Sequence, residues 1–254
     1  MKECTNALLG HKTIRKFKKE PLSKEVVEHL LAVANHTATS MGMQMASIVR
    51  ITDPDKKSTL ASIGNQPYMA DATELWIFIV DLWRNMEIAK AYAQEKGLSI
   101  EDFSSYVNMD KFFQGFTDAC LMAQNVVSAA EISGYGTNYF GNIHNDLQRV
   151  IELLELPLYT LPVVGLGIGV PDQEPQLKPR LSVTSRVFEN TYPQEIDKTA
   201  LAFYDEIIQS YYDLREGGRP QESFSKQVFE KQGVSILKRN DILQVMKHQG
   251  FHVE

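Results

Sequence analysis

Apolar residues recur along the chain with the periods of strands and helices. Residues 46–52 (ASIVRIT) alternate between apolar and polar side chains, which predicts a strand. Residues 75–80 (LWIFIV) are apolar throughout, which is typical of a strand buried on both faces. Residues 161–170 (LPVVGLGIGV) predict a second central strand, in which three glycines alternate with apolar residues.

Helical periods occupy much of the remaining chain. A helix is predicted after a cap at Ser23, with one apolar face that contains Val26, Val27, Leu30, Leu31 and Ala34. Residues 117–133 are apolar around nearly the whole circumference, so this helix, including Cys120, is predicted to be buried and to end at Gly134. Residues 147–154 predict an amphipathic helix that Pro157 stops, and residues 171–193 predict a long loop.

Two more segments complete the predicted organisation. Residues 85–112 are polar and predict surface helices, whereas residues 197–214 predict one long helix. That helix carries an apolar stripe formed by Ala200, Leu201, Tyr204, Ile207, Ile208, Tyr211 and Tyr212. Such a stripe is too large to leave in water, so it predicts that this helix packs against another surface. Few strands among many helices favour an α+β fold in a single domain, residues 1–254.

Composition narrows the functional class. The 254 residues include 26 Lys and Arg against 32 Asp and Glu, and this net charge of −6 argues against a nucleic-acid-binding protein. Two cysteines cannot form a disulfide framework, and the longest apolar run is far shorter than a membrane span. We therefore expect a cytoplasmic enzyme or small-molecule binder, with no membrane partner.

Common catalytic motifs are missing from the sequence. Residues 165–169 (GLGIG) lack the G-x-G-x-x-G spacing of a dinucleotide fingerprint and precede a proline. The six histidines show no metal-ligand spacing, and no G-x-S-x-G elbow is present. These absences give no support to a metalloenzyme or a hydrolase, and no residue is predicted to act as a catalytic acid, base or nucleophile.

Two basic clusters remain, at residues 11–17 (HKTIRKF) and 177–181 (LKPRL). Each cluster alone is typical of a solvated cationic surface. Together, in an acidic protein, they indicate a phosphate pocket, because the guanidinium fork, the ammonium and the imidazole all suit a dianionic phosphate. The sequence leaves both interpretations open.

Seven short motifs follow one another along the chain. They begin with His11-x-Thr13-Ile14-Arg15-x-Phe17, Gln44-x-x-Ser47-Ile48-x-Arg50-Ile51 and Gly64-Asn65-Gln66-Pro67-Tyr68. They continue with Ala123-Gln124-Asn125, Tyr139-Phe140-Gly141-Asn142, Leu177-Lys178-Pro179-Arg180-Leu181 and Glu189-Asn190-Thr191-Tyr192. Each motif is weak, but the ordered set spans nearly the whole chain and is specific. It resembles the nitroreductase family, in particular its oxygen-insensitive NADPH nitroreductases and NADPH-flavin oxidoreductases.

The resemblance implies a fold, a cofactor and an assembly. The fold would be a mostly antiparallel central sheet surrounded by helices, with residues 197–254 forming an extension that embraces the partner of a homodimer and contacts the reductant. FMN would bind tightly at the subunit interface. NADPH or NADH would reduce it, and small-molecule acceptors would reoxidise it by ping-pong hydride transfer.

The resemblance also assigns residues to this site. The implied FMN contacts are His11, Thr13, Arg15, Thr39, Ser40, Gln66, Tyr139, Phe140, Gly141, Asn142, Lys178 and Arg180. Three of these positions or their neighbours depart from the family pattern, because Thr13 and Met41 stand where serine is usual and Asn142 stands where glycine is usual. The implied substrate and NADPH contacts are Arg215, Arg219, His144 and Arg239.

Three functions fit these residues. We expect reduction of nitroaromatics, quinones or related acceptors. One alternative is an NAD(P)H-flavin reductase that supplies free reduced flavin, and another is a flavin-binding protein without catalysis. All three would keep the phosphate site, so the binding clusters do not separate them.

Overall fold

The computed structural model describes residues 2–99, 106–214, 219–234 and 236–253. The chain forms two compact units, which we treat separately. Unit 1 contains Met1–Leu9, Thr13–Gln173 and Ile236–Glu254, and unit 2 contains Gly10–Lys12 and Glu174–Ser235. Residues 197–254, expected to form one extension, are therefore shared between the two units.

Unit 1 is built around a four-stranded sheet of order β1-β2-β4-β3, in which every neighbouring pair is antiparallel. The strands are β1 (Ala46–Ile51), β2 (Glu74–Asp81), β3 (Gly136–Phe140) and β4 (Thr160–Gly169). All residues of β2 are buried, as its uniformly apolar sequence predicted. β2 and β4 lie at the centre of the sheet, as predicted from the apolar run of β2 and the apolar, glycine-containing sequence of β4.

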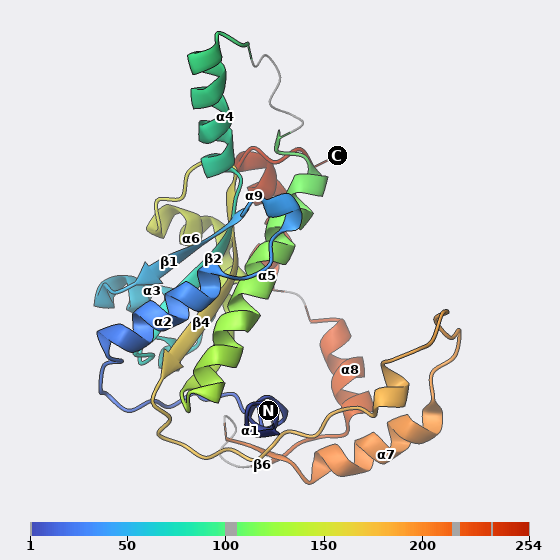
Figure 1. The fold of residues 1–254 in the computed structure, drawn as a ribbon. Helices are drawn as coiled ribbons and strands as arrows, with labels where there is room; N and C mark the ends of the chain where they lie inside the picture. Colours follow the sequence, from blue (N-terminus) through green and yellow to red (C-terminus); the bar gives the residue numbers. More distant parts are fainter. Residues whose placement is uncertain (1, 100–105, 215–218, 235, 254) are drawn as a thin grey trace. The chain divides into compact units, whose positions relative to one another are not determined.

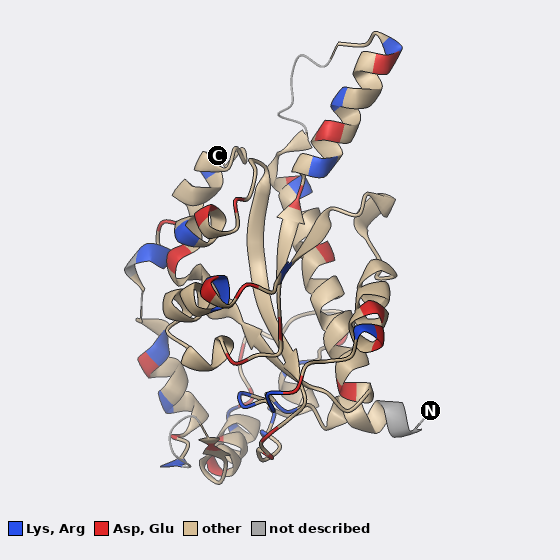
Figure 2. Cartoon of the chain, turned by 90° about the vertical axis from the view of Figure 1, so that its left-hand side faces the viewer, with Lys and Arg blue, Asp and Glu red and all other residues tan. Residues whose placement is uncertain are grey.

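Helices cover both faces of this sheet (Figure 1). α2 (Lys24–Asn35) and α5 (Met109–Ile132) pack on one face, and α3 (Pro54–Gly64) and α6 (Leu147–Leu153) pack on the other. Unit 1 also contains α1 (Lys2–Leu9), α4 (Trp83–Lys96) and α9 (Ile242–His248). Charged residues lie mostly on the helices and loops, whereas the strands carry few (Figure 2). The α+β prediction is confirmed.

Local capping explains where several helices begin and end. Ser23 caps α2 as predicted, because its Oγ accepts from the Val26 N–H at 3.3 Å. Asp53 caps α3 in the same way, and Pro54 occupies the first turn of that helix, which suits its fixed φ. Gly134 follows α5 with φ +83°, the left-handed conformation that favours glycine after a helix.

The helix α5 differs from its prediction in length and in burial. It begins at Met109, where the Asn108 side chain caps it, and not near residue 117. The prediction that nearly its whole circumference is buried was wrong: Cys120 is exposed, and Leu121 is 46% exposed. The face of α5 toward the sheet and α2 is covered. The apolar residues on its other face, such as Leu121, are not buried within this chain.

Unit 2 has a small core of its own. It contains α7 (Lys198–Gln209), α8 (Phe224–Gln232) and the short pair β5 (Tyr212–Asp213) and β6 (Arg219–Pro220). Tyr204, Ile208 and Tyr211 are 7%, 1% and 8% exposed, and they pack with Leu181 and Phe224. The expected helix 197–214 is too long, because α7 ends at Gln209. Three residues of the predicted apolar stripe, Tyr204, Ile208 and Tyr211, are buried within unit 2.

The remaining connections agree with the sequence. The segment 171–193 is a long loop interrupted by one 3₁₀ turn, Val183–Ser185. None of the helices in the described part of the chain is long and apolar enough to cross a membrane.

Candidate functional site

The turn that carries Gln66 leaves a buried polar atom without a partner. α3 ends at Gly64, and Asn65 takes a left-handed conformation with φ 49° that reverses the chain. The Gln66 N–H then donates to the Ala61 carbonyl at 3.0 Å. The side-chain Oε1 of Gln66 is buried but accepts no hydrogen bond from any described residue. Since buried amide oxygens are nearly always paired, this atom indicates a ligand contact.

The segment after β3 packs directly against this turn. Asn142 Nδ2 donates to the Gly64 carbonyl at 3.2 Å. A Cβ on Gly64 would lie 2.9 Å from Met69 Cε, the flexible end of that side chain, and 3.6 Å from Asn142 Cβ, so the two segments are in close contact here. Space is open where a Cβ of Gly141 would lie. Asn142 itself has no positive φ, so asparagine in place of the usual glycine causes no backbone strain here.

Tyr139 and Phe140 place their side chains on opposite faces of β3. The Tyr139 hydroxyl donates to Gln124 Oε1 at 3.3 Å on the α5 face, and burial raises its pKa. The Phe140 ring is fully buried against Tyr68. Only the backbone of Phe140 can therefore meet a ligand, which agrees with the expected backbone contact.

Arg239 joins the same group of residues. Its Nη2 donates to the Gly141 carbonyl at 2.9 Å, and its Nε donates to Asn145 Oδ1 at 3.0 Å. His144 lies half-buried beside it, with Nε2 3.1 Å from the Pro162 carbonyl. Burial, together with the charge of Arg239, lowers the pKa of His144. The structure thus brings Arg239 to the segment 139–142, close to His144, and their contact with a substrate stays a prediction.

The first basic cluster extends the sheet at the β3 edge. Thr13 forms a parallel bridge with Thr137, and the Ile14 N–H donates to the Thr137 carbonyl at 2.9 Å. A Cβ on Gly136 would lie 2.6 Å from Ile14, so the segment can pair this closely only beside a glycine. Farther along, Lys16 forms an ion pair with Asp172 at 2.7 Å. Arg15 is half-buried in this edge segment.

The second basic cluster belongs to unit 2, as does His11. Arg180 is exposed, and its Nη1 donates to the Lys178 carbonyl at 3.0 Å. The Lys178 ammonium lies 5.7 Å from the centroid of the Tyr211 ring, a cation–π distance. Lys12 forms an ion pair with Glu174, which ties the segment of His11 to the start of the long loop.

Thr39 and Ser40 lie away from Thr13, at a different level of α5. Both bind Asp118 of α5, through the Thr39 hydroxyl at 2.5 Å and the Ser40 N–H at 2.8 Å. The β3 edge is instead bonded to Glu131 of α5, which accepts from Thr137 Oγ1 at 2.6 Å. Thirteen residues of helix separate the two carboxylates, or about 20 Å along the axis. One chain therefore does not bring Thr39 and Ser40 to Thr13.

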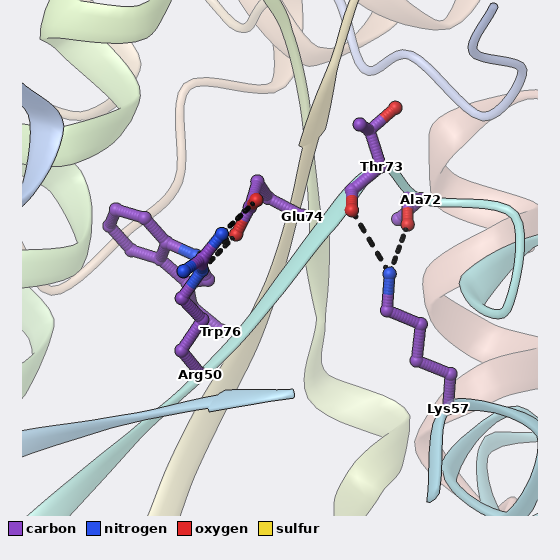
Figure 3. A network of polar contacts seen from close by, with 6 residues as sticks. All are labelled: Arg50, Lys57, Ala72, Thr73, Glu74 and Trp76. Atoms are coloured by element: carbon purple, nitrogen blue, oxygen red, sulfur yellow. Dashed lines mark hydrogen bonds and ion pairs between the residues drawn. The ribbon is translucent and has the colours of Figure 1, made fainter. Parts of the chain in front are cut away.

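An ion pair between the buried Glu74 and the exposed Arg50 lies at the start of β2, a few residues after the Gln66 turn (Figure 3). Arg50 donates to both carboxylate oxygens of Glu74 at 2.6 Å, and Trp76 Nε1 donates to Glu74 at 2.8 Å. Burial alone would raise the pKa of Glu74, but the bonds from Arg50 and Trp76 and the charge of Lys57 lower it below its ordinary value. Lys57 Nζ donates to the carbonyls of Ala72 and Thr73 at 2.8 and 3.0 Å, and its burial lowers its pKa.

Sequence reasoning missed both Asp118 and this ion pair. A lone carboxylate within an otherwise apolar stretch of α5 was the available signal for Asp118. Of the two arginines expected to contact NADPH, Arg215 lies outside the described residues, and Arg219 is exposed in β6, opposite Asp213. No cluster of three or more His, Cys, Asp or Glu that could hold a metal occurs in the described part of the chain.

An antiparallel sheet flanked by helices defines an α+β protein, and the unpaired Oε1 of Gln66 beside residues 141–142 marks its candidate ligand site. Two family models match the chain: the "Nitroreductase family" model over residues 8–170 and the "Nitroreductase family, C-terminal domain" model over residues 178–254. The chain therefore belongs to the nitroreductase family of oxidoreductases.

Individual relatives cover nearly the full chain. An NADPH-dependent oxidoreductase of Staphylococcus saprophyticus is 34% identical and covers 97% of this chain and 96% of its own. An oxygen-insensitive NADPH nitroreductase of Salmonella typhimurium is also 34% identical, with 99% of each chain covered.

Solved structures agree with this assignment. Nitroreductase A of Vibrio parahaemolyticus has a TM-score of 0.86 at 34% identity, with 100% of both chains covered. The NADPH:FMN oxidoreductase of Vibrio harveyi complexed with NAD⁺ has a TM-score of 0.82 at 31% identity and covers 99% of this chain and 100% of that one. The predicted family and fold are confirmed.

Proposed function

We propose that the protein is an FMN-dependent oxidoreductase of the cytoplasm that uses NADPH or NADH to reduce nitroaromatics, quinones or related acceptors by ping-pong kinetics. The observation that carries this proposal is the buried, unpaired Oε1 of Gln66. The pyrimidine edge of a flavin offers both N–H and carbonyl groups, and a glutamine amide can pair with either kind. Glutamine at this position is also what the family resemblance assigns to that edge.

The other residues fit FMN by their chemistry. Thr13 and Arg15, together with His11, Lys178 and Arg180, would hold the phosphate, because fixed cations and hydroxyl donors suit a dianion. The backbone of residues 139–142 would face the ring, beside the open space at Gly141. Bound FMN supplies the two-electron centre that accepts hydride from the nicotinamide and gives it to the acceptor.

The protein residues then have positioning and electrostatic roles. Gln66 orients the flavin by its polar edge, and Arg239, held by Gly141 and Asn145, places a positive charge on the same side of unit 1. A cation near the acceptor favours the electron-rich oxygens of nitro and quinone groups. His144 is neutral near pH 7, because its pKa is lowered, and so adds a polar group without charge.

A flavin reductase is the second candidate. It is favoured by the likeness to a structure described as an NADPH:FMN oxidoreductase. The two candidates share the bound cofactor and the reductant, and they differ only in the acceptor.

We also propose that the site is completed in a homodimer. If Thr39 and Ser40 contact the same cofactor as Thr13, a second copy must supply them, since about 20 Å of helix separates the two ends within one chain. Unit 2 offers a surface for this second copy: a groove of about 840 Å³ whose lining includes Phe188, Tyr192, Ile196, Phe224, Val228 and Phe229. Phe229 is 85% exposed in a single chain, which is unusual for so large an apolar residue.

Absorbance of the purified protein tests cofactor binding, and steady-state oxidation of NADPH tests the reaction. Addition of a nitroaromatic, a quinone or free FMN then separates the two candidates by the acceptor that is turned over. A colourless protein that does not bind added FMN would contradict both. Sedimentation analysis tests the dimer, and a stable monomer that retains FMN would contradict it.

A further inference from the structure

The loop from Thr39 to Met45 has an unusual backbone. Met41, Gly42 and Gln44 have φ values of 54°, 70° and 51°, so two of these three left-handed residues are not glycine. Such conformations cost energy for residues with a Cβ and persist only where the surroundings impose them. Loops with this property cluster at ligand-binding sites, because the strain fixes a side chain in a useful position.

Asp118 is the group that imposes the conformation. It projects from α5, is 2% exposed, and accepts from the Thr39 hydroxyl at 2.5 Å and the Ser40 N–H at 2.8 Å. It also accepts from the Met45 N–H at 3.2 Å. One carboxylate therefore binds both ends of the loop. A buried carboxylate is costly unless it is paired, and these donors supply the pairing.

The start of α4 holds the middle of the same loop. Arg84 donates to the Gln44 carbonyl, and Asn85 Nδ2 donates to the Met43 carbonyl at 2.9 Å. These contacts leave the backbone little freedom between the two points that Asp118 fixes. The loop is thus preorganised before any ligand arrives.

The hydrogen bonds also distinguish the two hydroxyls of the loop. Thr39 Oγ1 donates to Asp118 and accepts from the Gln44 N–H at 2.8 Å, so it is used by the loop itself. The Ser40 backbone N–H donates to Asp118, and its carbonyl accepts from the Met43 N–H at 3.0 Å, whereas its hydroxyl makes no hydrogen bond to any described residue. Ser40 is therefore the hydroxyl that remains available to a ligand, whereas Thr39 is part of the scaffold.

We propose that Asp118 is the positioning residue of the Thr39–Met45 loop, and that it acts by presenting the Ser40 hydroxyl to the flavin of the partner subunit. This inference rests on the proposed function and goes beyond it, because it assigns a role to Asp118 and separates the roles of Thr39 and Ser40. Thr39, expected from the resemblance to lie near the cofactor, acts through the loop.

Asp118→Asn is the sharpest single change. It preserves the side-chain shape, but one of the two oxygens becomes an amide NH₂, which cannot accept from the backbone N–H of Ser40 or of Met45, whichever it faces. We expect FMN to bind to the apoprotein about five- to tenfold more weakly, the scale of one lost hydrogen bond. Asp110→Asn is the matched control, because Asp110 lies on the same helix and accepts from the Gln114 side chain at the surface. The control should bind FMN like the wild type.

A double-mutant cycle separates positioning from general destabilisation. If Asp118 acts through Ser40, then Asp118→Asn combined with Ser40→Ala should bind FMN no more weakly than the weaker single variant. Multiplied losses would show that the two residues act independently and would overturn the proposal. The cycle is measured by flavin fluorescence on apoproteins whose folding is checked by circular dichroism.

If Asp118→Asn does not fold, a second pair of variants at Thr39 tests the same proposal. Thr39→Ser retains the bridging hydroxyl and should bind FMN normally, whereas Thr39→Val removes it and should show the loss expected of Asp118→Asn. Equal FMN binding by both variants would overturn the proposal. A wild-type apoprotein that does not bind FMN would instead reject the proposed function, so the two failures are distinguishable.

Discussion

The Gln66 turn of unit 1 and the basic loop of unit 2, residues 177–181, are built in opposite ways. The turn is tied to the segment after β3 by the hydrogen bond from Asn142 to the Gly64 carbonyl, and its unpaired atom is buried. The basic loop offers an exposed Arg180 and a Lys178 that lies over an aromatic ring.

This difference teaches how one cofactor can be recognised by two kinds of structure. A neutral ring edge gives little binding energy unless its partner is fixed and shielded from water, so its contact belongs in a rigid core. A phosphate is attracted from a distance by any well-placed cation, so exposed loops can hold it. We therefore expect the loop to determine affinity and the turn to determine orientation.

The largest effect should come from the cations. Arg15→Ala or Arg180→Ala should weaken FMN binding roughly ten- to a hundredfold, because a charge-assisted bond contributes about 1.5–3 kcal/mol. Both variants should purify largely as colourless apoprotein, measured by flavin absorbance. Arg186→Ala is the control, since Arg186 is an exposed arginine of the same long loop. Wild-type flavin content in the first two variants would show that these clusters are solvated surfaces.

The next effect concerns the reductant. Arg215→Ala should raise the KM for NADPH about tenfold, the scale of one lost phosphate contact, and should leave the NADH kinetics and the flavin content nearly unchanged. The KM values of Arg219→Ala, a change on the other side of the two glycines, are measured in the same way for comparison. If the KM values for both nicotinamides rose equally, the segment would shape the site in general and would not recognise the 2′-phosphate.

The sequence predicted what depends on local pattern. β2 and β4 are nearly continuous apolar runs, and α2 has a clear cap and face, so all three were found near their true bounds. β3 (GTNYF) has no such pattern, because it forms by pairing with β4 and with the segment of Thr13. α3 was also missed, although Asp53 followed by Pro54 is a helix-start signal as well as a strand terminator.

Tertiary partners explain the remaining differences. The stripe of α7 correctly indicated burial, but the sequence cannot say that the partner is unit 2 itself. The same limit applies to the site. The family motifs contain Gln66 and Asn142, which the structure brings together, whereas Asp118 stands out only when its three donors, distant in sequence, are seen together.

Gln66→Leu tests the role of the rigid turn in stability and in FMN binding. In the apoprotein the change removes a buried acceptor without a partner, so the free energy of unfolding should rise by about 1 kcal/mol. In the presence of FMN the same change loses a hydrogen bond, and affinity should fall about fivefold. Thermal unfolding with and without FMN measures both effects.

Gln249→Leu is the matched contrast to this variant. Gln249 is also a buried amide, but its Nε2 donates to the carbonyls of Pro157 and Thr160 at 3.0 and 3.1 Å. Its loss should destabilise the protein by about 1–3 kcal/mol and leave FMN affinity unchanged. If both variants changed stability in the same direction, the Gln66 amide would not be the unpaired group that the comparison requires.

The smallest effect should be a pH dependence of unit 1 through His144. Burial, with the charge of Arg239, lowers the pKa of this imidazole in the folded protein, whereas the unfolded chain has the ordinary value of about 6.5. Above that value the ring is neutral in both states, and the full stability is present. As the pH falls below about 6.5, the unfolded chain binds a proton that the folded protein does not, so stability is lost until the folded pKa is passed. Melting temperatures measured from pH 8 to pH 5.5 should therefore fall more steeply for the wild type than for His144→Gln. Equal slopes would mean that the ring takes up its proton as readily in the folded state, and that this edge of the site is less rigid than the Gln66 turn.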